Sequence, residues 1–213
     1  MSAIVRRILR LGRRRLTGHQ PTSLSPDLRQ GEELFISHGS GEWNLHQRYQ
    51  EPHEVFFDGP TIKFSVVART KDEWAYVFLD PAHYKWDNYC WEARIRRETD
   101  FREFAFNFRY NDFGNRYRYR FEKGRLYFDK KVRAVWTNNI AAVPFHMDLG
   151  RSYDLRIWVW QSIFRCCVDG SMILENRDHD LPRGSICVVL WEDDARTNMV
   201  ASVDGVRVTK VRI

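Results

Sequence analysis

Apolar and polar residues alternate with a period of two along most of the chain from residue 31 onward. In residues 103–110, for example, three phenylalanines alternate with Ala105, Asn107 and Arg109. This alternation is typical of half-buried β-strands. It predicts strands at 63–69, 74–80, 90–96, 103–110, 116–121, 125–132, 153–160, 164–170, 186–191 and 201–211. Because no long helical period follows residue 20, the many short strands predict an all-β sandwich or barrel.

The first twenty residues differ from the rest of the chain in charge. They carry six basic residues and no acidic one: Arg6, Arg7, Arg10, Arg13, Arg14 and Arg15. The whole chain has 34 Lys and Arg against 28 Asp and Glu, so residues 21–213 carry no formal net charge. A basic domain favours nucleic acid, but here the excess charge lies in residues 1–20, so we expect no nucleic-acid partner.

The sequence therefore divides into three parts. We expect an arginine-rich amphipathic arm or short helix at 1–20, a Pro- and Ser-containing linker at 21–30, and a single β-domain at 31–213. Arginines interrupt the apolar residues of the arm, so a secretory signal is not expected, and no apolar stretch is long enough for a transmembrane helix.

The arm has three interpretations. It can lie on an anionic membrane surface, dock on a partner or on its own domain, or serve as an organelle transit peptide. We favour membrane or partner docking, which predicts a cytoplasmic or peripheral membrane protein. The four cysteines Cys90, Cys166, Cys167 and Cys187 have no metal-site or disulfide-framework spacing, so we expect free thiols in a reducing compartment.

Residues 84–211 contain a series of strand and turn motifs in a fixed order. They read "WEARIR" at 91–96, "NRYRYR" at 115–120, "GRLYFDKKV" at 124–132, "LRIWVWQSIFRCCVDG" at 155–170, "DLPRGSI" at 180–186 and "VDGVRV" at 203–208. This series resembles the concanavalin-A-like (laminin-G-like) jelly-roll superfamily of lectins and glucanases. The resemblance implies a two-sheet antiparallel jelly-roll sandwich. It leaves the function open, because this fold hosts lectins, binding modules, hydrolases and lyases.

The stretch "ETDFRE" places Glu98, Asp100 and Glu103 in the spacing E-x-D-x-x-E. This is the catalytic spacing of one class of β-sandwich glycoside hydrolases, where paired carboxylates do the chemistry. The resemblance, however, places the catalytic strand at residues 116–124, whose polar face carries arginines. We therefore interpret the stretch as a solvated, charged hairpin loop without a catalytic role. No other hydrolase, phosphate-binding or metalloprotease motif occurs.

The polar face of the predicted strands is the more distinctive candidate site. If the phenylalanines and tyrosines point inward, the opposite face carries Glu92, Arg94, Arg96, Asn107, Arg109, Arg116, Arg118, Arg120, Tyr127, Asp129 and Lys131. If these strands are neighbours in a concave sheet, the arginines form a basic trough for an acidic glycan or another polyanion. The alternative is a solvated outer face with cross-strand ion pairs.

Two tryptophans and several acids add to this picture. Trp158 and Trp160 alternate with aliphatic residues and so point outward, either to stack on sugar rings or to lie beneath the N-terminal segment. The resemblance allows calcium as a cofactor. Asp204 matches the aspartate of the closing strand in that superfamily, and Glu192, Asp193 and Asp194 end another strand. We expect no other cofactor.

Three functions follow from these features. The first is a non-catalytic carbohydrate-binding jelly-roll module with a membrane- or partner-docking basic tail. The second is a hydrolase or lyase of the same fold that acts on glycans; a lyase would use Tyr, His and Arg side chains of the concave sheet. The third is a structural or assembly protein that uses the sandwich for protein contacts. We favour the first.

Overall fold

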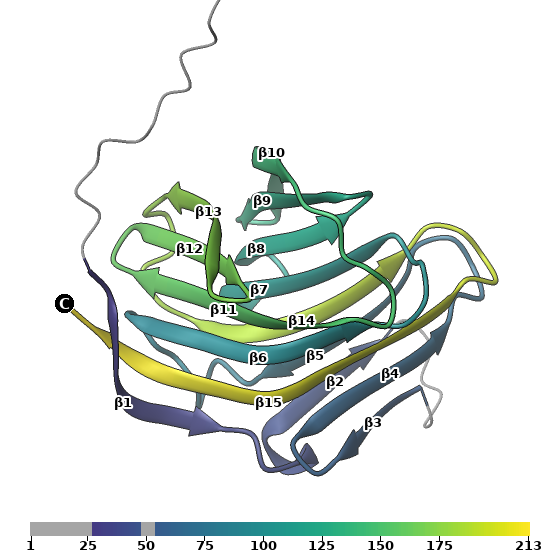
Figure 1. Ribbon diagram of the computed structural model, residues 1–213, viewed down its shortest axis with the longest axis horizontal. Helices are drawn as coiled ribbons and strands as arrows, with labels where there is room; N and C mark the ends of the chain where they lie inside the picture. The colour runs from purple at the N-terminus through teal and green to yellow at the C-terminus, as the bar shows by residue number, and fades with distance from the viewer. Residues whose placement is uncertain (1–26, 48–53) are drawn as a thin grey trace, which may run out of the picture.

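The computed structural model describes residues 27–47 and 54–213 of the 213-residue chain. Within these residues, two antiparallel sheets of eight and seven strands pack face to face (Figure 1). The predicted all-β sandwich is therefore confirmed. Residues 1–26, which include the arm and most of the predicted linker, lie outside the described part, and the first strand begins at Arg29.

The eight-stranded sheet has the strand order β13-β12-β11-β6-β15-β4-β3, and β1 also pairs with β15. The bounds of its strands are β1 Arg29–Ile36, β3 Val55–Asp58, β4 Thr61–Val67, β6 Tyr89–Arg97, β11 Ser152–Trp160, β12 Ile163–Val168, β13 Ser171–Arg177 and β15 Asn198–Arg212. The 15-residue strand β15 pairs with β1, β4 and β6, so the end of the described chain lies in the interior of this sheet.

The seven-stranded sheet has the order β10-β9-β8-β7-β14-β5-β2. The bounds of its strands are β2 Trp43–Gln47, β5 Glu73–Leu79, β7 Glu103–Asp112, β8 Asn115–Glu122, β9 Arg125–Val132, β10 Val135–Pro144 and β14 Ser185–Glu192. A short 3₁₀ helix, Ser40–Glu42, precedes β2.

Aromatic rings from the inner face of the seven-stranded sheet fill much of the core. Phe104, Phe106 and Phe108 on β7 are fully buried, as the period-two pattern predicts. Phe108 pairs in register with Tyr117 on β8, and their ring centroids lie 5.6 Å apart. Because side chains alternate across a strand, the residues between these rings must point to the outer face of the sheet.

Two-residue turns with positive φ connect several strands. The turn between β8 and β9 uses Lys123 and Gly124, with φ values of 48° and 72°. The turn between β9 and β10 uses Arg133 and Ala134, with φ values of 50° and 65°. Such a turn normally needs glycine or asparagine, since a left-handed conformation costs other residues about 1–2 kcal/mol each.

The ten predicted strands are present, and the pattern missed β1, β2, β3, β10 and β13. One interpretation of the connections was wrong. The stretch from Glu98 to Arg102 is not a hairpin loop, because β6 belongs to the eight-stranded sheet and β7 to the seven-stranded sheet. The chain crosses between the sheets there.

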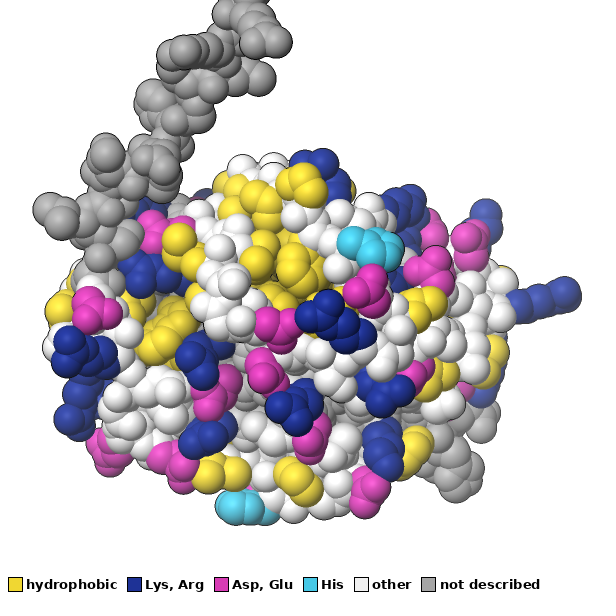
Figure 2. All heavy atoms as spheres, viewed as in Figure 1, with side chains coloured by type: hydrophobic (Ala, Val, Ile, Leu, Met, Phe, Trp, Pro, Cys, Tyr) yellow, Lys and Arg dark blue, Asp and Glu magenta, His cyan; other side chains and the backbone are white. Residues whose placement is uncertain are grey.

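The outer face of the eight-stranded sheet carries basic and acidic side chains in alternation (Figure 2). Arg94 on β6 pairs with Asp154 on β11 at 3.0 Å, and Glu92 lies 3.1 Å from both Arg156 and Arg207. In the described part of the chain, the four cysteines are free, and no helix is long and apolar enough to cross a membrane.

Candidate functional site

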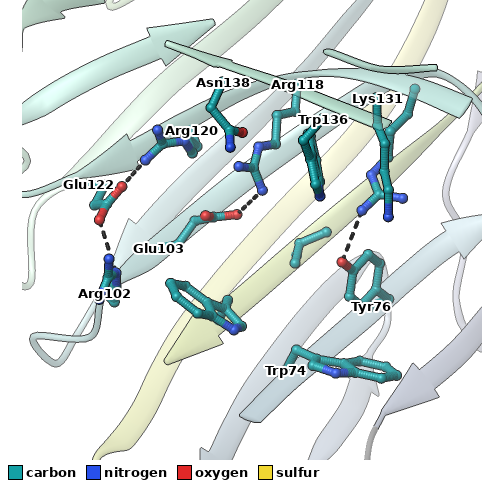
Figure 3. A pocket seen from close by; sticks show the side chains of 13 residues that line it. Trp74, Tyr76, Arg102, Glu103, Arg118, Arg120, Glu122, Lys131, Trp136 and Asn138 are labelled. Atoms are coloured by element: carbon teal, nitrogen blue, oxygen red, sulfur yellow. Dashed lines mark hydrogen bonds and ion pairs between the residues drawn. The ribbon is translucent and has the colours of Figure 1, made fainter. Parts of the chain in front are cut away.

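The outer face of the seven-stranded sheet contains a pocket of about 400 Å³. We call it the aromatic–arginine pocket. Its rings and charged groups come from six strands and from Arg102, which precedes β7 (Figure 3). They are Trp74 and Tyr76 on β5, Glu103 on β7, Arg116, Arg118, Arg120 and Glu122 on β8, Lys131 on β9, Trp136 on β10 and Trp191 on β14. Asn138 and Val189 complete the lining.

Strand alternation explains why these side chains meet. On β8, Tyr117, Tyr119 and Phe121 point into the core, so the arginines between them point outward. The same rule places Trp74 and Tyr76 opposite the buried Ala75 and Val77. Cross-strand pairing then brings the outward residues of neighbouring strands together, as with Arg118 and Asp129.

Ion pairs connect the floor of the pocket. Arg118 donates from Nη1 to Glu103 Oε1 at 2.7 Å and from Nε to Asp129 Oδ2 at 2.8 Å. Arg120 Nε also donates to Asp129 Oδ2, at 2.6 Å, and Arg120 pairs with Glu122. Asp129 is fully buried, whereas Arg118 keeps 13% of its side chain exposed. Charged side chains held in this way form a rigid set of donors and acceptors at the bottom of the pocket.

Aromatic rings form the walls. The Arg118 guanidinium carbon lies 4.1 Å from the centroid of the Trp136 ring, and the Arg102 guanidinium lies 4.8 Å from that of Trp191. Trp74 and Tyr76 meet edge to face, with centroids 5.1 Å apart. Burial raises the pKa of Tyr76, so its hydroxyl stays protonated and accepts a hydrogen bond from Arg116 at 3.2 Å. The pocket therefore combines flat apolar surfaces with fixed polar groups.

Arg118 and Arg120 of the sequence-predicted trough lie in this pocket, and Tyr127 lies beside it, 4.1 Å from the Arg120 guanidinium. Asn107 points to the same face but is fully buried between Cys187 and Arg118 of the adjacent strands. Among the residues that the structure describes, its side-chain amide has no hydrogen-bond partner. Asn107 is thus beneath the surface and not on it.

Arg109 lies elsewhere. Its φ of 45° and a register shift between Phe108 and Asp112 turn its side chain out of the alternation. The buried guanidinium donates to the carbonyl oxygens of Leu181 at 2.6 Å, Gln161 at 2.6 Å and Asp87 at 2.9 Å. Burial lowers the pKa of Arg109. This arginine joins three connections at one end of the sandwich and does not reach the aromatic–arginine pocket.

Arg94, Arg96, Trp158 and Trp160 belong to the other sheet. Arg94 and Arg96 lie on the outer face of β6, where Arg96 pairs with Glu98 at 2.6 Å. Trp158 and Trp160 point outward, as predicted, and pack against Leu28, Cys90 and Val211. The predicted trough is therefore divided between two opposite faces, because β6 is not a neighbour of β7, β8 or β9.

The three carboxylates of "ETDFRE" also separate. Glu98 pairs with Arg96, and Asp100 pairs with Arg97 at 2.8 Å with 89% of its side chain exposed. Glu103, by contrast, is not in a solvated loop. It begins β7, is buried, and pairs with Arg118 in the pocket. The expectation of a solvated loop was therefore wrong for Glu103.

The acids considered for calcium have other contacts. Carboxylate oxygens of Glu192, Asp193 and Asp194 lie within 4.8 Å of one another. Glu192 accepts from the backbone amides of Arg102, Asp193 and Asp194, and Asp193 pairs with Arg102. Asp204 accepts from the Thr61 hydroxyl at 2.7 Å. The contacts of Glu192 fix the loop after β14, and the three carboxylates are close enough to share a cation.

Several residues that line the pocket were not among the site residues predicted from the sequence. Trp74 and Tyr76 are visible in the alternation of residues 74–80, but nothing in the sequence shows that β5 shares a sheet with β8. Trp136 lies on β10, which the pattern missed. Arg116 and Lys131 were in the predicted polar face, and the structure places them side by side.

The architecture is that of the lectin-like, concanavalin-A-like β-sandwich, as the sequence motifs imply. Among solved structures, a protein of unknown function with a galectin-like fold from Bacillus subtilis superposes with a TM-score of 0.65 and 12% identity, covering 86% of this chain and 98% of that one. The carbohydrate-binding module CBM66 from Bacillus subtilis gives a TM-score of 0.61 and 14% identity, with 79% and 96% covered.

The exoplasmic/lumenal domain of VIP36, in its Ca²⁺- and Man3GlcNAc-bound form, gives a TM-score of 0.62 and 6% identity, with 88% and 92% covered. No protein-family model and no curated protein matches the chain. At these identities the likeness is one of fold.

Proposed function

We propose that this chain is a non-catalytic carbohydrate-binding module and that its glycan binds in the aromatic–arginine pocket. The observation that carries this proposal is the combination of indole walls with a floor of fixed ion pairs in one hollow. Tryptophan offers an apolar face on which a sugar ring packs. The paired arginines and carboxylates offer donors and acceptors that orient hydroxyl groups.

The carboxylates of the pocket favour binding over hydrolysis. Glycoside hydrolysis needs two carboxyl groups that flank the scissile bond, one of them free to protonate it. Glu103 and Asp129 are instead held by the same guanidinium group of Arg118, and Asp129 is fully buried. Held in this way, they act as fixed acceptors.

The charge of the pocket favours an acidic glycan. Its lining carries Arg102, Arg116, Arg118, Arg120 and Lys131 against Glu103 and Glu122, and Asp129 lies beneath. The fold supports the general class of ligand, because CBM66 is a carbohydrate-binding module and the VIP36 domain was solved with a bound glycan.

We also propose that the arginines of residues 1–20 hold the module at an anionic membrane surface, as a peripheral protein. The described chain begins next to Leu28, which packs on the outer face of the eight-stranded sheet. The pocket opens on the other sheet, so a tether at Leu28 leaves it accessible. Flotation with phosphatidylserine vesicles tests this: recovery should fall when residues 1–20 are deleted, and equal recovery would contradict it.

A glycan array with the full chain tests the main proposal. We expect binding to a subset of glycans, loss of binding in Trp136→Ala, and retained binding in Trp158→Ala on the opposite face. Both variants are checked for folding by circular dichroism. Equal binding by the two variants would place the site elsewhere, and release of reducing ends from any bound glycan would favour an enzyme.

A further inference from the structure

Two basic side chains in the pocket face each other across β8 and β9. Arg116 and Lys131 are directly opposed in the strand register. The next outward pair along these strands is Arg118 with Asp129, which carries opposite charges. Like charges directly opposite one another destabilise a sheet. The Arg116–Lys131 pair should therefore lower the stability of the free protein.

The charge of Asp112 acts on Lys131, but burial and the charges of Arg116 and Arg118 outweigh it and lower the pKa of Lys131. Within the described residues, neither Arg116 nor Lys131 forms an ion pair. Arg116 is 2% exposed; it donates to the Phe113 carbonyl and to the Tyr76 hydroxyl, and its buried Nε has no partner. Asp112, the nearby acid, accepts from Gly114 N and from Asn115 Nδ2 in its own turn.

Three basic side chains lie close to the ring of Trp136. Its centroid lies 4.1 Å from the Arg118 guanidinium carbon, 4.9 Å from that of Arg116 and 5.3 Å from Lys131 Nζ. In Figure 3 the indole lies between Arg118, which points toward Glu103, and Lys131. Trp136 therefore separates the ion-paired part of the pocket from the part where positive charge is unpaired.

We infer that Arg116, Lys131 and Trp136 form a subsite for an oxyanion carried by a sugar: the carboxylate of a uronic acid or a sulfate ester. This inference rests on the proposed glycan-binding function and deepens it. The oxyanion neutralises the opposed cations and accepts charged hydrogen bonds from both, while the sugar ring lies against Trp136. The ion-paired arginines on the other side of Trp136 bind neutral hydroxyl groups.

The experiment compares ligands that differ only in charge. Titration calorimetry with the full chain uses oligogalacturonate against its methyl ester, and chondroitin sulfate against unsulfated chondroitin. The first pair isolates the carboxylate and the second the sulfate. We expect at least one charged member to bind about tenfold more tightly than its partner, the factor that one charged hydrogen bond contributes.

Two variants and one control locate the effect. Lys131→Gln should remove the preference for the more highly charged ligand of a pair and leave the affinity for its partner unchanged. Arg125→Gln is the control, since Arg125 lies on the same strand, is exposed and lies outside the pocket. Arg116→Lys keeps the charge and should lose part of the preference.

The outcomes separate the two proposals. Binding without charge preference, or equal effects of Lys131→Gln and Arg125→Gln, would overturn the subsite and leave the binding module standing. If no glycan of the array or of these pairs binds, the proposed function is wrong and the subsite with it. Thermal denaturation gives an independent check, because removing a like-charge pair should leave Lys131→Gln at least as stable as the parent protein.

Discussion

The outer faces of the two sheets are built from the same kinds of side chains but differ in burial and pairing. On the eight-stranded sheet, Arg94 and Asp154 pair while 62% and 66% of their side chains stay exposed. On the seven-stranded sheet, the Arg118–Asp129 pair is 13% and 0% exposed, and two further cations, Arg116 and Lys131, form no ion pair with any acid in the described part of the chain. The first face also has a hollow, of about 480 Å³, but the Arg94–Asp154 ion pair that lines it is largely exposed to solvent. On the second face, Trp136 on β10 covers the charged residues of the pocket.

This comparison shows that alternation alone does not identify a binding face. Both faces satisfy the same period-two pattern. The two faces differ because Trp136 on β10 covers the charged residues of one of them, and because basic residues outnumber acidic ones under that tryptophan. The two faces can therefore be tested against each other with matched substitutions.

Removal of one acid from each face should have the largest effect. Asp129→Asn takes the shared acceptor from the buried Arg120 and the mostly buried Arg118, and we expect a loss of about 3 kcal/mol in the free energy of unfolding. Asp154→Asn removes an exposed partner and should change stability by about 0.5 kcal/mol or less. Urea denaturation measures both values, and similar losses would show that the two faces do not differ in this way.

Removal of one tryptophan from each face should affect binding next most strongly. Trp136→Ala should weaken binding of the glycans found on the array about 30-fold, or about 2 kcal/mol, as for a buried aromatic contact. Trp158→Ala should leave the affinity unchanged. Calorimetry distinguishes them, and a loss in Trp158→Ala alone would move the site to the eight-stranded sheet.

The pH dependence of binding should sharpen the contrast further. Burial and then the charges of Arg116 and Arg118 lower the pKa of Lys131 below its ordinary 10.5. Binding of an anionic glycan needs the protonated amine, so affinity should fall as pH rises through this lowered pKa, before an ordinary lysine titrates. Because the unfolded chain keeps the proton longer, stability of the free protein should rise over the same interval. Neither change should remain in Lys131→Gln.

The reactivity of cysteines on the two outer faces should show the smallest difference. Cys187 lies on the outer face of the seven-stranded sheet but is fully buried, and burial raises its pKa to about 12. Cys167 lies on the outer face of the eight-stranded sheet and is only half-buried. Iodoacetamide at pH 8 should modify Cys167 first, and Cys187 only after unfolding. Mass spectrometry of the labelled peptides checks the order.

The sequence predicts the sandwich well because the aromatic alternation on β7 and β8 is strong and its turns are conventional. It misses β10 for a physical reason. The preceding turn uses Arg133 and Ala134 where glycine or asparagine is usual, so no turn signal marks the strand. The strand itself is mostly exposed and contains a register shift after Thr137, so it has little apolar period.

The candidate site was predictable only in part. Arg118 and Arg120 follow from alternation on one strand. The division of the arginines between two faces does not, because it depends on which strands become neighbours: β6 pairs with β11 and β15, far away in sequence. The predicted position of Arg109 was wrong for a local reason. Its left-handed backbone interrupts the alternation that the prediction assumed.

The position of β15 has a consequence for the timing of folding. This strand lies between β4 and β6 and also pairs with β1. During synthesis, β1, β4 and β6 are made first, and they can pair with β15 only after residues 198–212 have left the ribosome. Until then their edges are open to other chains. A nascent chain released before residue 198 should therefore need a chaperone, whereas the seven-stranded sheet already has all its strands.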